Sequence, residues 1–97
     1  MKKVEKIKAI LKEYKSELKE KYRVKEIGVF GSYVRGEAKK KSDIDILVSF
    51  DGSMGLFKFL DLEEYLHEIT GTKVDLVMKT ALKPRIGKHI LNEVVYI

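Results

Sequence analysis

Apolar residues in the first quarter of the chain recur at steps of three and four, the spacing of one face of an amphipathic helix. We therefore expect a helix from about Lys2 to Lys21. A second helical pattern runs from Leu56 to Ile69 and stops near Gly71, which suits a helix C-cap. Pro84 suits the first turn of a last helix. The apolar positions of the first helix are Val4, Ile7, Leu11, Tyr14, Leu18 and Tyr22.

Three short segments between these helices have strand patterns. Residues Val24–Phe30 are rich in β-branched and aromatic side chains and contain one glycine, Gly28. Residues Asp43–Phe50 alternate at first and then become continuously apolar, as in a central strand buried on both faces. Residues Lys73–Met78 form the third segment. With a short helix from Ser32, its expected N-cap, the order is α-β-α-β-α-β-α. This order predicts an α/β fold with a small mixed sheet of about three strands packed by helices.

Length and composition limit the classes of protein that need to be considered. The 97 residues are 44% hydrophobic and include no cysteine. We expect one domain over residues 1–97, with an N-terminal helix at 1–22 and a core at 24–97. No stretch approaches the about 18 apolar residues of a membrane span, and the N-terminus is charged. We therefore expect a soluble, cytoplasmic protein with no membrane partner.

Charge is abundant, at 36% of residues with a net charge of +5. A basic balance can attract nucleic acid or phosphates. Lys and Glu are interspersed along most of the chain, however, which is typical of the surface ion pairs of proteins from hot environments. We favour the second interpretation, so direct nucleic-acid binding is not expected. The one run of a single sign is Lys39–Lys41, which we interpret as a solvated loop, with steering of a triphosphate as the alternative.

Asp43 and Asp45 carry the first candidate chemistry. Residues two apart in a strand point to the same face, so both carboxylates project together. Two close negative charges repel unless a cation lies between them, and Mg²⁺ prefers carboxylate and phosphate oxygens. A pair of aspartates at an exposed strand end is the competing interpretation.

Asp75 favours the metal-binding interpretation over that of an exposed strand end. It is the one charge among Val74, Leu76 and Val77, where a carboxylate is costly to bury unless it is paired or bound to metal. If the second and third strands are neighbours, Asp75 joins the other two aspartates in a cluster that can hold two metal ions. An edge-strand aspartate that faces water is the alternative.

Gly31 and Ser32 stand where the first strand meets a helix. Glycine allows close approach of a ligand to the backbone, and the serine hydroxyl can donate to a phosphate oxygen. A P-loop is excluded, because Glu37 stands where the lysine of that motif belongs. Arg35 could reach phosphates, or it could pair with Glu37 or Asp43, and the sequence leaves both open. His67 and His89 are expected at surface or boundary positions.

These residues together resemble a known family. Gly31-Ser32, ten residues and Asp43-Ile44-Asp45 form the GSx₁₀DxD signature of the DNA polymerase β-like nucleotidyltransferase superfamily. The stretch GSYVRGEAKKKSDIDILVSF is similar to its minimal MNT branch, and KVDLV at 73–77 matches the position of the third aspartate there. The ending LKPRIGKHILNEVVYI is also similar, so the resemblance extends from about residue 24 to the end.

The resemblance implies the nucleotidyltransferase fold and a nucleotidyl transfer reaction. Gly31 and Ser32, with Arg35 as a further candidate, would bind the triphosphate of ATP. Asp43, Asp45 and Asp75 would bind two Mg²⁺ ions, and Asp75 would help to deprotonate the attacking hydroxyl. Attack on the α-phosphate would release pyrophosphate.

The resemblance also implies a partner. MNT proteins are typically paired with a HEPN-domain toxin, so the expected role is that of an antitoxin that transfers AMP to a hydroxyl of the toxin. We expect acceptor recognition to come from this partner or from an oligomer, because 97 residues leave no room for an acceptor domain. A binding module that masks its partner without turnover, and nucleotidyl transfer to RNA or a small molecule, are the alternatives.

Overall fold

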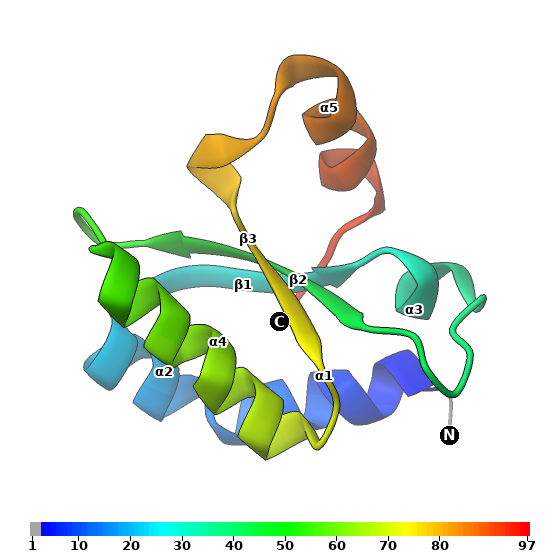
Figure 1. The fold of residues 1–97 in the computed structure, drawn as a ribbon, viewed down its shortest axis with the longest axis horizontal. Helices are drawn as coiled ribbons and strands as arrows, with labels where there is room; N and C mark the ends of the chain where they lie inside the picture. The colour runs from blue at the N-terminus through cyan, green and yellow to red at the C-terminus, as the bar shows by residue number, and fades with distance from the viewer. Residues whose placement is uncertain (1–2) are drawn as a thin grey trace.

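The computed structural model describes residues 3–97, which form helices on both sides of one sheet (Figure 1). The helices and strands in chain order are α1 (Lys3–Glu13), α2 (Lys15–Tyr22), β1 (Val24–Phe30), α3 (Ser32–Arg35), β2 (Ile44–Phe50), α4 (Leu56–Thr70), β3 (Val74–Met78), the 3-10 helix η1 (Lys79–Ala81), α5 (Pro84–Glu93) and β4 (Val95–Tyr96). The expected elements are all present, within one or two residues at most ends. The exceptions are a break in the first helix and an additional strand.

The sheet is mixed, as predicted, and its strand order is β3-β2-β1-β4. Strand β2 runs parallel to β3 and antiparallel to β1, and β1 pairs antiparallel with β4. Parallel pairing of β2 with β3 places the starts of both strands at the same end of the sheet. The antiparallel β1 ends there, so the residues that follow β1 lie beside the residues that begin β2 and β3.

One face of the sheet carries the hydrophobic core. Helices α1, α2 and α4 cover this face, whereas α5 stands on the other side (Figure 1). Alternation along the strands sends every second side chain into the core. Leu11, Ile44, Ile46, Leu62 and Leu66 are completely buried there. The residues between them, including Asp45, face the opposite side, which is therefore the side where chemistry can be exposed.

The N-terminal helix is divided in two, which corrects the expectation of one helix over residues 2–21. Helix α1 ends at Glu13 and α2 begins at Lys15, while Lys2 lies outside the described residues. The hydrogen bonds on either side of the break continue, because Tyr14 N–H donates to Ile10 O at 3.2 Å. The Tyr14 ring meets Tyr65 of α4 edge-on at 6.2 Å. The apolar residues keep their steps of three and four across this kink, so the sequence periodicity does not reveal it.

The outer edge of β3 is protected by α4. Leu76 N–H donates to the Glu63 carboxylate at 3.0 Å, and Val74 N–H donates to Nδ1 of His67 at 3.2 Å. These contacts satisfy backbone groups that an edge strand would leave open to another chain. His67 is half-buried and acts as a structural acceptor, consistent with the boundary position expected for it. Within residues 3–97, no helix is both long and apolar enough to cross a membrane.

The sequence did not predict strand β4. The sheet of the described residues therefore has four strands instead of the expected number of about three. Two residues are too few to show a pattern of alternation. The signal that could have revealed β4 is Gly28, because a glycine inside a strand often marks close approach of another backbone. A Cβ at Gly28 would lie 2.7 Å from Val94 Cγ2 and 2.9 Å from Val95 O.

We predict that Gly28→Ala separates β4 from β1 and destabilises the protein by about 1–3 kcal/mol, the usual cost of overpacking. Chemical denaturation would measure the free energy of unfolding. Gly55→Ala is the control, since nothing lies within 4 Å of that position and its φ of −71° suits any residue. Its expected cost is less than about 1 kcal/mol. Equal stability of the two variants would contradict the packing of β4 on β1.

Candidate functional site

The three predicted aspartates meet at the end of the sheet where β2 and β3 begin. Asp45 and Asp75 are direct neighbours in the parallel register of these strands. Asp43 lies just before β2, two residues from Asp45, and its charge is close enough to act on the Asp45 carboxylate. The expectation that the second and third strands are adjacent, and that they bring Asp75 beside the DxD pair, is confirmed.

The burial expected for Asp75 is wrong, and the alternative of an edge-strand aspartate that faces water is confirmed. Strand β3 lies at the edge of the sheet, and Asp75 is exposed on the face opposite the core. Asp43 is also exposed and lies 4.0 Å from Lys73 Nζ. Asp45, on the inner strand β2, is the half-buried member of the group. Strand order, which no local pattern reports, decides which of the three carboxylates is shielded from water.

The three carboxylates interact electrostatically. Burial raises the pKa of Asp45 above its ordinary value, and the charges of Asp75 and Asp43 raise it further. Such mutual repulsion is relieved by a cation. Within residues 3–97, no group of three or more His, Asp or Glu side chains is already arranged to hold a metal ion. The donor type nevertheless fits a hard cation such as Mg²⁺, which prefers carboxylate oxygens.

Gly31 follows β1 directly and lies against Asp45. Its φ of 80° and ψ of −152° are available to glycine and strained for other residues. A Cβ at Gly31 would lie 3.0 Å from Asp45 Cγ and would collide with the carboxylate oxygen beyond it. The glycine therefore makes room for the half-buried aspartate, a role that the sequence did not reveal. It also corrects the expected N-cap, because Gly31 occupies that position and Ser32 is the first residue of α3.

Arg35 is held in ion pairs. Its Nε lies 2.6 Å from Glu37 Oε1, and its Nη1 lies 2.7 Å from Glu93 Oε1. These hydrogen bonds raise the pKa of Arg35. Of the two partners proposed from the sequence, Glu37 is confirmed, whereas Asp43 pairs with Lys73 instead.

Glu93 is the residue of this site that sequence reasoning missed. It is the last residue of α5, and its Oε2 accepts the Gly31 N–H at 2.8 Å. Burial would raise the pKa of Glu93, but the hydrogen bonds from Arg35 and Gly31 outweigh it and lower the pKa. The carboxylate is therefore ionised at neutral pH. A glutamate near a helix end is so common that its sequence context held no signal for this contact.

A hollow of about 670 Å³ opens between the end of β1 and α5. This volume falls within the about 300–1,000 Å³ of ordinary ligand pockets. Arg35 and Asp45 lie on the side toward the sheet, and α5 contributes both apolar and polar side chains. The lining residues are Phe30, Gly31, Arg35, Asp45, Ile86, His89, Ile90, Asn92 and Glu93. His89, expected at the surface, is exposed on this wall.

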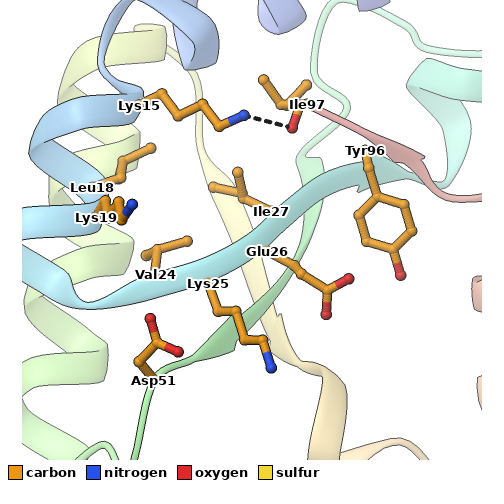
Figure 2. A pocket seen from close by; sticks show the side chains of 10 residues that line it. All are labelled: Lys15, Leu18, Lys19, Val24, Lys25, Glu26, Ile27, Asp51, Tyr96 and Ile97. Atoms are coloured by element: carbon orange, nitrogen blue, oxygen red, sulfur yellow. Dashed lines mark hydrogen bonds between the residues drawn. The ribbon is translucent and has the colours of Figure 1, made fainter.

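A second hollow, of about 550 Å³, lies at the other end of β1 (Figure 2). Lys15 reaches across its rim and donates to Ile97 O at 3.3 Å. Glu26, on its wall, is already bound by Lys79 at 3.2 Å and by Ser49 at 3.1 Å. None of the residues predicted from the sequence for the site lines this hollow. The candidate chemistry is therefore gathered at the end of β1.

The exposed loop of Lys39–Lys41 approaches the aspartates from outside. Lys40 and Lys41 line a shallow depression together with Asp43 and Lys73. All three lysines of the run are exposed, which agrees with the interpretation as a solvated loop.

Comparison with known proteins identifies relatives along almost the whole chain. The family described as "Nucleotidyltransferase domain" matches residues 11–97. Protein adenylyltransferase MntA of Thermococcus cleftensis is 57% identical over 94 residues, which cover 97% of this chain and 95% of the relative.

Two solved structures share the fold. A candidate minimal nucleotidyltransferase superposes with a TM-score of 0.75 at 30% identity and covers 92% of this chain and 93% of its own. A complex of a tri-AMPylated Shewanella oneidensis HEPN toxin with an MNT antitoxin contains a chain with a TM-score of 0.65 at 20% identity. That match covers 94% of this chain and 67% of the other and supports the fold alone.

The predicted mixed sheet, the grouping of the aspartates beside the glycine-serine pair and these relatives lead to the same conclusion. The family match covers far more than half of the chain, and the Thermococcus cleftensis relative is similar along nearly its full length. The chain belongs to the family of nucleotidyltransferase domains.

Proposed function

We propose that this protein transfers AMP from ATP to a protein hydroxyl, and that the acceptor is a HEPN-domain toxin that it neutralises as an antitoxin. The observation that carries the proposal is the register of β2 with its two neighbours, because Asp45 pairs with Asp75 of β3 and lies against Gly31 at the end of β1. The high identity to a protein named as a protein adenylyltransferase supports adenylyl transfer.

In this proposal, Asp43, Asp45 and Asp75 hold the divalent cations, for which we expect two Mg²⁺ ions. Bound Mg²⁺ would polarise the phosphate oxygens and offset the charge that develops during transfer. We propose the half-buried Asp45 as the central ligand, since the charges of both other aspartates act on its carboxylate. Asp75 faces solvent, where an acceptor hydroxyl would enter, and we propose that it helps to take the proton of that hydroxyl.

The triphosphate is proposed to bind along Gly31 and Ser32, at the mouth of the hollow beside α5. Gly31 permits close approach of the backbone, and the Ser32 hydroxyl supplies a donor. Arg35 adds a positive charge on the same short helix, although Glu37 and Glu93 already neutralise it in part. Its role toward ATP is therefore more that of a structural neighbour than of a free phosphate ligand.

The proposed acceptor rests on the solved complex of a HEPN toxin with an MNT antitoxin, in which the toxin is described as AMPylated. A partner that binds next to the exposed Asp75 could present a tyrosine or serine hydroxyl to it. The active assembly would then be a hetero-oligomer.

The test is incubation of the purified protein with adenine-labelled ATP, Mg²⁺ and the HEPN protein encoded beside it. We expect label to appear on the HEPN protein and its toxicity to fall. Chelation of Mg²⁺, or the double change Asp43→Asn with Asp45→Asn, should reduce labelling to background.

Undiminished labelling by the double variant would refute the proposed role of the aspartates. Neutralisation by Asp75→Ala protein as complete as by the wild type, without labelling, would indicate masking by contact. Extension of RNA 3′ ends in place of protein labelling would identify a different acceptor.

A further inference from the structure

Glu93 connects the C-terminal helix to the segment that begins α3. Its two carboxylate oxygens are used separately, one by the Gly31 N–H at 2.8 Å and one by Arg35 Nη1 at 2.7 Å. The side chain is only 21% exposed, and its lowered pKa keeps it charged. Both contacts are therefore charge-assisted hydrogen bonds, about twice as strong as neutral ones.

These contacts restrain the two groups whose orientation matters most in the candidate site. Gly31 has φ 80° and ψ −152°, one of many conformations that are open to glycine, so contacts from neighbouring groups are needed to select it. A hydrogen bond to its N–H restrains the rotation of the Phe30–Gly31 peptide, through which the chain passes from β1 into α3. Arg35 donates to Glu93 from Nη1 and to Glu37 from Nε, and these two bonds together restrict the orientation of its guanidinium.

We propose that Glu93 is a positioning residue for nucleotide transfer, which acts through Gly31 and Arg35 to hold the triphosphate-binding segment in its productive arrangement. This inference rests on the proposed function of Gly31 and Ser32. It assigns to α5 a role in the site beyond forming one wall of the hollow. A carboxylate that merely occupied the phosphate position would have the opposite effect, because its removal would tighten nucleotide binding.

The experiment compares Glu93→Gln and Glu93→Leu with the wild type in AMP transfer at varied MgATP concentration. Glutamine retains an oxygen for the Gly31 N–H but loses the charge that pairs with Arg35, whereas leucine loses both contacts. We expect KM for MgATP to rise about threefold in the first and about tenfold or more in the second, as weakened and lost charge-assisted bonds predict. The value of kcat should change less than KM.

Two control variants separate positioning from general destabilisation. Glu37→Gln weakens the pairing with Arg35 and leaves the Gly31 bond intact, so its KM should rise no more than that of Glu93→Gln and far less than that of Glu93→Leu. Glu63→Gln weakens another carboxylate bond to a backbone N–H, that of Leu76 beneath α4. It should lower the thermal midpoint as Glu93→Gln does, without a change in KM. Circular dichroism would verify that each variant is folded.

The amide proton of Gly31 supplies a readout that does not depend on turnover. Its NMR resonance should move upfield in Glu93→Leu as the hydrogen bond is lost, and titration with MgATP would give Kd directly. An unchanged KM and Kd in a folded Glu93→Leu protein would overturn the positioning role while leaving the proposed function intact. A lower Kd would overturn it in favour of a carboxylate that competes with phosphate. A wild-type protein that binds no MgATP would remove both proposals.

Discussion

Asp45→Asn protein should fold normally and transfer AMP about a thousandfold more slowly than the wild type, or not measurably. Asp45 is the half-buried carboxylate with a neighbour on each side, Asp75 in register and Asp43 two residues away. Asparagine keeps the shape but loses the charge on which a divalent cation depends. Loss of one electrostatic contact in an active site already costs about 10²–10³ in rate, and loss of a central metal ligand should cost at least as much.

The same change should not destabilise the metal-free protein. Burial first, and then Asp75 and Asp43, raise the pKa of Asp45, so ionisation of this group is less favourable in the folded chain than in the unfolded chain. The folded state therefore favours the protonated form of Asp45. This preference stabilises the fold below the ordinary carboxyl pKa, and the stabilisation is lost as the pH rises through the raised pKa. At neutral pH, asparagine removes the unfavourable free energy of an ionised, half-buried carboxylate. The thermal midpoint of Asp45→Asn should therefore equal or exceed that of the wild type.

Thermal unfolding with and without Mg²⁺ would check both parts of this prediction. A ligand that binds the folded state raises the midpoint, so Mg²⁺ with a nucleotide should stabilise the wild type and leave Asp45→Asn almost unchanged. Asp51→Asn is a suitable control, since this exposed aspartate lies just after β2 at its opposite end. Full activity of the Asp45→Asn protein would contradict the proposed role of the Asp45 carboxylate as a metal ligand.

Gly31→Ala is expected to have the second largest effect. The added Cβ would meet the Asp45 carboxylate, and alanine is strained at φ 80° and ψ −152°. We expect about 3 kcal/mol or more of destabilisation, because strain and overpacking act at one position. Displacement of Asp45 and of the Gly31 peptide should also reduce AMP transfer by about a hundredfold or more, since small misplacements in an active site are costly.

Gly36→Ala provides a matched control for this substitution. Gly36 also has a positive φ, of 72°, but nothing lies within 4 Å of the position where its Cβ would stand. It should cost only the strain of the left-handed conformation, about 1 kcal/mol, with transfer retained. Denaturant unfolding and labelled-ATP transfer on both variants would measure the difference. Equal losses in the two proteins would show that backbone strain, rather than contact with Asp45, explains the effect at Gly31.

Local patterns predicted most of the elements in this fold. Apolar spacing located α4, strand composition located β1 and β3, and Pro84 marked the start of α5. These features depend on a residue and its neighbours within a few positions, which a sequence displays directly. The kink at Tyr14 and the two-residue β4 were not predictable from such neighbours. Tyr14 contacts Tyr65, and β4 pairs with β1 at Gly28, and both partners are distant in sequence.

The candidate site divides along the same line. By itself, the sequence determined which residues could carry the chemistry: Asp43 and Asp45 share a face because strand residues alternate, and Gly31-Ser32 precedes them at the spacing of the family. Only the tertiary structure decided how these groups meet. The order of the strands left Asp75 exposed and Asp45 shielded, and the return of the chain through α5 brought Glu93 to Gly31 and Arg35. Burial, register and charge pairing depend on segments that are far apart along the chain, so no local pattern could have determined them.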